Sequence, residues 1–189
     1  MVLASRSPQR RALLAGLGVE FDTAEPMIEE LTEGDPRELV LENARWKAAA
    51  VAATAKPGTL VIAGDTEVVL DGAALGQPRD ADEAREMLGR LSGREHEVLG
   101  GLALLGPEQE EGRPRTREGF AATTVRFREL DDVLLGAYLA SGEWEGRAGS
   151  YAIQGLGSAL VAGVEGDVSN VIGLPIPLLL ELEPGFQRS

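Results

Sequence analysis

The part of the sequence that most constrains the fold is the N-terminus, where an apolar segment leads directly into a basic helix start. Residues 2–4 (Val-Leu-Ala) predict a buried strand. Ser7 and Pro8 follow as the expected N-cap and first helical residue, because serine accepts from free N–H groups and proline lacks one. The leucine spacing beyond them predicts a helix that ends near Gly18.

Three arginines, Arg6, Arg10 and Arg11, fall at the beginning of this helix. Cations are normally favoured at the opposite end, so these act against the helix dipole. A bound anion would remove the conflict, since helix N-termini and guanidinium groups both bind phosphate. On this stretch alone, an ordinary surface helix with solvated arginines explains the pattern equally well.

The rest of the chain alternates helices and strands without a simple βαβ rhythm, which predicts an α/β fold with a mixed sheet. The 189 residues suit one domain or two tightly joined lobes. Helices are expected at about 36–55, 81–91 and 131–141, and strands at 19–22, 59–70, 95–105, 118–128 and 159–164. Loops are expected over the acidic residues 25–34 and the Gly/Pro/Glu-rich residues 106–116.

Composition restricts the classes of partner. With 31 acidic against 18 basic residues, the formal net charge is −13. Such a chain is repelled by nucleic-acid backbones and anionic membranes, so neither is an expected partner. No apolar run reaches the roughly 18 residues that span a bilayer, and we see no signal peptide. The absence of cysteine fits a cytoplasmic protein.

Four polar residues stand out against apolar surroundings. Asp65 interrupts an apolar run, where a carboxylate is costly unless it is paired, so it is either a general base or metal ligand or a turn residue. Lys47 lies on the preceding helix and is either solvated or functional. Gln154 lies between the apolar Ile153 and glycines, which either allow close approach of a ligand or form a plain turn. For His96, the only histidine, a structural role is favoured over a catalytic one, and a zinc site is not expected.

Several short motifs then occur in the order typical of one family. They are Leu3-Ala4-Ser5-x-Ser7-Pro8-x-Arg10, Ala44-x-x-Lys47-Ala48, Gly64-Asp65-Thr66, Pro78, Ser92-Gly93-x-x-His96-x-Val98, Ala148-Gly149-x-Tyr151-x-Ile153-Gln154-Gly155 and Asn170-Val171-x-Gly173-Leu174-Pro175. Over about residues 2–178 the chain resembles Maf proteins, nucleoside triphosphate pyrophosphatases historically called septum-formation proteins.

The resemblance implies an α/β fold of the Maf/ITPase type, with an elongated mixed β-sheet flanked by helices. Two lobes with an active-site cleft between them would form a single domain over residues 1–189, often as a homodimer. The implied reaction splits a nucleoside triphosphate into the monophosphate and pyrophosphate, with Mg²⁺ or Mn²⁺ as the divalent metal cation. Water attacks the α-phosphorus, and positioning and charge neutralisation supply most of the catalysis.

The resemblance also implies individual roles. Asp65 would be the proton acceptor that activates water, and Arg10 and Lys47 would bind the phosphates. Ser5 would donate a hydrogen bond at the first strand–helix turn. Glu30 would hold the metal together with Asp65 and the phosphates.

Three positions sort the branches of the family. Thr66 and Gln154 resemble the branch acting on dTTP and UTP, whereas the 7-methyl-GTP branch tends to carry Gln and Glu there. Gln9 matches neither branch, since one usually has Arg and the other Trp. Gln77 replaces a usual Lys, and Glu67 replaces a usual apolar residue. Loss of the two cations predicts weaker triphosphate binding unless neighbouring arginines, Arg6 and Arg79, offset it.

The leading interpretation is therefore a dTTP/UTP pyrophosphatase with a possible activity on modified pyrimidine nucleotides. The alternative within the same chemistry is a 7-methyl-GTP or broad-specificity nucleoside triphosphate pyrophosphatase. The alternative from another class is a nucleotide-binding regulator of cell division with little turnover, which the glutamines at positions 9 and 77 favour.

Overall fold

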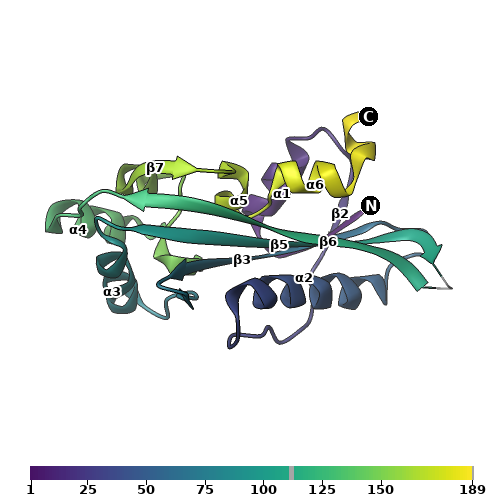
Figure 1. Cartoon of the computed structure of the whole chain (residues 1–189), viewed down its shortest axis with the longest axis horizontal. Coiled ribbons are helices and arrows are strands. Elements are labelled where there is room, and N and C mark those ends of the chain that lie inside the picture. The colour runs from purple at the N-terminus through teal and green to yellow at the C-terminus, as the bar shows by residue number, and fades with distance from the viewer. Residues whose placement is uncertain (111–112, 189) are drawn as a thin grey trace.

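A long mixed β-sheet runs the length of the protein, and helices cover both of its faces (Figure 1). The computed structural model describes residues 1–110 and 113–188. The strands are β1 Val2–Ala4, β2 Asp22–Ala24, β3 Val61–Leu70, β4 Ala73–Ala74, β5 Glu95–Glu110, β6 Arg113–Phe127 and β7 Val161–Glu165. Their order is β2-β1-β3-β5-β6-β7, with β4 paired to β3. Among the described strands, the β1–β2 and β1–β3 pairs are parallel and the others antiparallel, so the predicted mixed sheet is confirmed.

Most helices begin where local capping chemistry predicts. They are α1 Pro8–Ala15, α2 Pro36–Ala52, α3 Ala81–Leu91, α4 Asp132–Ser141, α5 Val168–Ile172 and α6 Ile176–Leu182, with 3₁₀ turns η1 Ala148–Ser150, η2 Gly155–Leu160 and η3 Pro184–Arg188. The Ser7 hydroxyl accepts from the Arg10 N–H, and Asp35, Asp80 and Asp131 cap their helices in the same way. Within the described residues, no helix is long and apolar enough to cross a membrane.

Two predicted boundaries are wrong, because strand pairing rather than local composition decides them. The second strand lies at Asp22–Ala24 instead of residues 19–22, since it pairs in parallel register with β1. Most of the expected loop 106–116 continues the two long strands, which extend to Glu110 and from Arg113. Residues 111–112 of that predicted loop lie outside the described part.

Strand β3 has a gap along one of its edges. On one side, β5 pairs with it from Val61 to Val69. On the other side, β1 pairs only with Val61 and Ile62, and β4 only with Val69 and Leu70. Among the described strands, none pairs with residues 63–68 on that side. The middle of β3 is therefore open to other parts of the chain.

Alternation along β3 sends its side chains to two different layers. Ala63 packs in the cluster beneath α2, together with Ala44 and Ala48, and Asp65 lies two residues further along the same face. Ile62 packs on the opposite face, in the cluster with Leu3, Leu14 and Leu174, and Thr66 follows on that face. At the gap, residues from the α2 side of the sheet and residues from the α1 side thus both lie next to the middle of β3.

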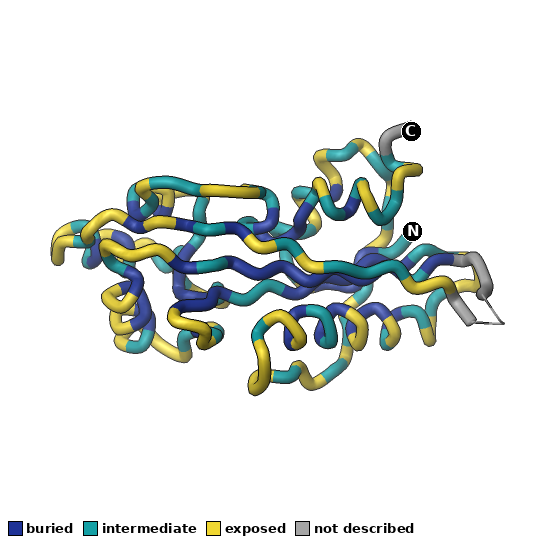
Figure 2. The backbone as a smooth tube through the Cα atoms, viewed as in Figure 1, coloured by how far each residue is buried: buried dark blue, intermediate teal, exposed yellow. Residues whose placement is uncertain are grey.

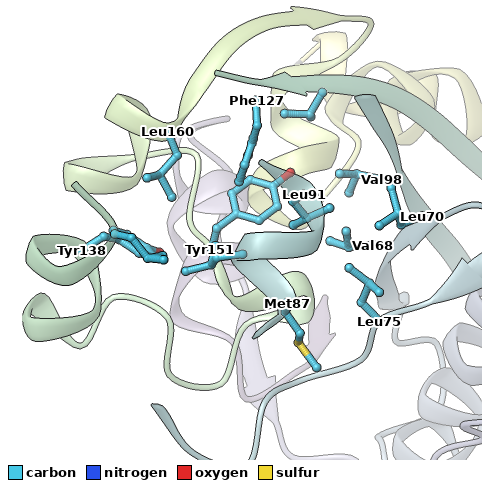
Figure 3. Close-up of a cluster of buried hydrophobic side chains, with 13 residues drawn as sticks. Val68, Leu70, Leu75, Met87, Leu91, Val98, Phe127, Tyr138, Tyr151 and Leu160 are labelled. Atoms are coloured by element: carbon cyan, nitrogen blue, oxygen red, sulfur yellow. The ribbon is translucent and has the colours of Figure 1, made fainter. Parts of the chain in front are cut away.

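The other end of the same sheet carries a separate hydrophobic cluster under α3 and α4. Figure 3 shows its side chains converging from β3, β5, β6 and the helices, with Phe127, Tyr138 and Tyr151 as its large members. The tube in Figure 2 is buried along the central strands and exposed on the outer helix faces. Because β3 and β5 contribute to clusters at both ends, the sheet joins the two halves.

Candidate functional site

Two adjoining cavities lie at the gap in β3. The larger holds about 360 Å³ and contains Glu30, Lys47 and Asp65 in its wall. The smaller holds about 140 Å³, and its wall includes Val68, Val98, Tyr151, Ile153 and Val171. Both cavities share one set of lining residues, namely Ser7, Gln9, Arg10, Thr66, Gln77, Gly146, Arg147 and Ala148. A charged compartment therefore opens into a more apolar one.

Asp65 is buried, and both of its carboxylate oxygens have partners. Lys47 Nζ donates to Oδ1 at 2.6 Å, and Asn43 Nδ2 donates to Oδ2 at 3.1 Å. Only 7% of the Asp65 side chain is exposed, a burial that would be costly for an unpaired carboxylate. Helix α2 thus fixes the orientation of the acid predicted as the proton acceptor.

Lys47 also reaches Glu30, which comes from the acidic loop. Its Nζ lies 2.8 Å from a Glu30 carboxylate oxygen, so two carboxylates converge on one ammonium group. The loop is held there by Asn43, which accepts from the Leu31 N–H at 2.8 Å and donates to the Leu31 carbonyl at 3.0 Å. Asn43 therefore connects the acidic loop to Asp65.

Arg10 crosses the gap from the first turn of α1. Its Nε donates to the Gly173 carbonyl at 2.7 Å, and its terminal nitrogens donate to Thr66 Oγ1 at 3.0 Å and to Ser5 Oγ at 3.5 Å. Burial lowers the pKa of Arg10, while the Asp65 and Glu30 carboxylates raise it. Guanidinium remains charged in proteins even so. The structure thus brings Ser5, Arg10 and Thr66 together beside Asp65.

The glutamines predicted to affect specificity line the cavities. Gln9 and Gln77 line both cavities, and the exposed Gln154 lines the smaller one. Arg6 lines the larger cavity and is paired with Glu25 at 3.2 Å. Arg79, the other arginine expected to offset the missing cations, lines neither cavity and forms an ion pair with Glu83. It therefore does not take the place of the lysine that is usual at position 77.

Three residues at the site were not predicted as site residues. Asn43 had a detectable signal, because it precedes Lys47 by one helical turn on the same face of α2. Glu67 was identified only as a departure from the family pattern. Its Oε2 is buried without a hydrogen-bond partner, and burial, with Asp65 and Glu30 nearby, raises its pKa to about 7. No local signal indicates Arg147.

His96 lies outside both cavities and packs against Phe127 and Tyr151, two members of the hydrophobic cluster under α3 and α4. Its Nε2 is 2.8 Å from the Tyr151 hydroxyl, and its ring meets those of Phe127 and Tyr151 edge to face. Burial lowers the pKa of His96 to about 4, so the ring is neutral near pH 7. These contacts match the structural role predicted for this histidine.

The two predicted metal ligands, Glu30 and Asp65, suit a cation that takes only one or two ligands from the protein. Within the described residues, no three His, Asp or Glu side chains form a group that could hold a metal ion. Glu30 and Asp65 do converge, as their shared contact with Lys47 Nζ shows. Mg²⁺ is commonly held by one or two carboxylates, with phosphates and water completing its shell. The two carboxylates are compatible with such an ion in the presence of a phosphate substrate.

Known proteins resemble this chain over most of its length. A family model described as Maf-like protein matches residues 1–183. A dTTP/UTP pyrophosphatase of Anaeromyxobacter sp. (strain Fw109-5) is 47% identical over 186 residues, covering 96% of this chain and 87% of the relative. That of Myxococcus xanthus (strain DK1622) is 46% identical, covering 93% and 87%. That of Pyrococcus horikoshii is 43% identical, covering 96% and 94%.

Proposed function

The chain belongs to the family of Maf-like proteins, and from this premise we propose that it hydrolyses dTTP and UTP to the monophosphate and pyrophosphate. Relatives named for this activity are 43–47% identical over nearly the whole chain. The observation that carries the proposal is the buried Asp65, held by Lys47 and Asn43 in the wall of a cavity that Arg10 also lines. This is a fixed carboxylate beside cations, as hydrolysis of a nucleotide anhydride requires.

The two cavities suit the two halves of a nucleotide. The larger one, with Arg10 and Lys47 in its wall, takes the phosphates. The smaller one takes the nucleoside, because Val68, Val98 and Tyr151 offer it apolar surface. Gln154 in its wall carries an amide that donates and accepts, as recognition of a pyrimidine edge requires.

In this arrangement Asp65 accepts a proton from the attacking water. A new bond forms between the water oxygen and the α-phosphorus, and the bond from that phosphorus to the bridging oxygen breaks, which releases pyrophosphate. Lys47 and Asn43 keep the carboxylate in one orientation throughout. Arg10 stabilises negative charge on the phosphate oxygens without moving, because Gly173 and Thr66 already hold its guanidinium.

Glu30 and Asp65 are the residues proposed to hold a divalent cation, Mg²⁺ or Mn²⁺, which when bound neutralises phosphate charge. Lys47 lies between these two carboxylates. Its ammonium keeps them together when no cation is bound, so the pair does not have to assemble during binding.

The test is pyrophosphate release from a panel of dTTP, UTP, 7-methyl-GTP and the common nucleoside triphosphates, with Mg²⁺ and with Mn²⁺. We expect dTTP and UTP to be preferred, and Asp65→Asn to lower kcat by about 10²-fold or more. Asp71→Asn, at an exposed hairpin turn, is the matched control and should keep full activity. An unchanged rate in Asp65→Asn would remove that residue from the mechanism. Tight nucleotide binding without pyrophosphate release at either metal would favour a low-turnover regulator.

A further inference from the structure

Arg147 stands where the two cavities join, on the segment between α4 and η1. It lines both cavities and is half-buried. Its Nε donates to the Glu143 carbonyl at 3.1 Å, which fixes the base of the guanidinium group. The rest of the group faces Gln9 across the junction. Arg147 thus comes from the half of the protein opposite Arg10 and Lys47.

Gln9 holds this guanidinium in place. With its amide nitrogen donating to Ser7 Oγ at 2.9 Å, its oxygen accepts from both terminal nitrogens of Arg147, at 2.9 and 3.2 Å. The reverse orientation of the amide would set its N–H groups against those of Arg147, so hydrogen bonding selects this one. A neutral side chain at position 9 therefore positions a cation that comes from position 147.

The guanidinium keeps binding capacity toward the cavity. Arginine has five N–H donors. Three are used here, one by Glu143 and two by Gln9, so two remain, one on each terminal nitrogen. Among the described residues, no carboxylate lies within ion-pair distance of Arg147, whereas Lys47 and Arg6 are both paired. Because Gln9 occupies the forked end of the guanidinium, the two remaining N–H groups point to different sides of it, and each can donate one charge-assisted hydrogen bond to a phosphate oxygen.

The charges of the larger cavity show why this cation matters. Its wall carries four cationic and four carboxylate side chains, namely Arg6, Arg10, Lys47 and Arg147 against Glu30, Asp65, Glu67 and Glu145. Removal of one cation leaves an excess of carboxylates facing a polyanionic substrate.

We propose that Arg147 binds the phosphate attached to the nucleoside, and that Gln9 is the positioning residue for it. This inference rests on the proposed function. It follows from position, because the junction of a nucleoside compartment and a phosphate compartment is where the α-phosphate lies. It also accounts for a glutamine at position 9, which provides a contact for a guanidinium rather than a second charge.

Binding of dTMP, measured by calorimetry without divalent cation, tests the proposal apart from turnover. We expect Arg147→Met to weaken dTMP binding about tenfold or more, since a charge-assisted hydrogen bond is lost. Thymidine binding should not change, because it lacks the phosphate. Arg147→Lys should recover only part of the affinity, since Lys cannot form the two-point contact with Gln9. Arg85→Met, an exposed arginine on α3, is the matched control and should match wild type.

The pair is tested by a double-mutant cycle. Gln9→Ala should weaken dTMP binding less than Arg147→Met, and the double variant should bind no more weakly than Arg147→Met alone. Unchanged dTMP affinity in Arg147→Met, an equal loss of thymidine affinity, or additive effects of the two substitutions would each overturn the assignment. If instead wild type releases no pyrophosphate from any nucleotide, the proposed function fails, which the dTTP assay shows independently.

Discussion

Lys47 Nζ and Asp65 Oδ1 lie 2.6 Å apart, and their side chains are only 6% and 7% exposed. Breaking such a buried pair leaves one charge without its partner, which costs more than the pair contributed. We expect Lys47→Met to lower the free energy of unfolding by about 3 kcal/mol. Urea unfolding with circular dichroism measures this.

The chain provides its own control for that experiment. Lys56, the only other lysine, is exposed beyond the end of α2. Lys56→Met should change the free energy of unfolding by less than about 0.5 kcal/mol. Equal losses in the two variants would contradict a special role for the buried pair.

Asn43→Ala should release the acidic loop. The substitution leaves the Leu31 N–H and carbonyl without their side-chain partner and removes one hydrogen bond to Asp65. We expect a loss of about 2 kcal/mol in unfolding free energy, the usual cost of unsatisfied buried groups. Faster amide exchange at Leu31 would locate the effect in the loop. Protection equal to that of wild type would show that other contacts hold it.

Alanine substitutions at two glycines near the junction of the cavities distinguish the cost of backbone strain from the cost of steric crowding. Both have positive φ, +64° at Gly149 and +65° at Gly146. A Cβ at Gly149 would meet the Val68 side chain at 2.8 Å, whereas one at Gly146 would meet nothing within 4 Å. We expect Gly146→Ala to cost about 1 kcal/mol and Gly149→Ala at least about 2 kcal/mol, measured as the free energy of unfolding. Similar costs would show that Val68 can move aside.

The single histidine should give the stability a specific dependence on pH. Folded His96 takes up a proton only near pH 4, while in the unfolded chain it does so near pH 6.5. The unfolded state therefore binds more protons between these values, and stability falls as the pH is lowered from about 6.5 to 4. The expected loss is up to about 3 kcal/mol, with no effect of this group above pH 7.

Comparison with His96→Gln isolates this contribution. Carboxylates titrate similarly in both proteins, so the difference between their unfolding free energies should change with pH only in that interval. Parallel stability curves from pH 4 to 7 would mean that the folded state accommodates the charged ring.

The features predictable from the sequence are those governed by neighbouring residues. Ser7 and Asp35 begin their helices because capping depends on the next three residues. The position of β2 was not predictable in this way, since its pairing with β1 determines its register. Local composition also gave no indication that β5 would continue to Glu110.

The same division holds for the candidate site. The N-terminal motif and the interrupted apolar run indicated Arg10 and Asp65, because each stands out in its own segment. Arg147 could not be predicted in this way, because it is marked only by its contact with Gln9, which is 138 positions away in the chain. Contacts between distant segments become visible only when the fold is known.

The gap along β3 also bears on strand pairing between copies of the protein. An unpaired strand edge normally invites another strand to pair with it. Here the open stretch is short and lies between β1 and β4, and the Arg10 side chain crosses it to bind Thr66 and Gly173. The side chain proposed to bind phosphate therefore also lies across the open stretch, where it would hinder intermolecular β-pairing. Substitution of Arg10 by a small apolar residue is then expected to promote self-association in addition to loss of activity.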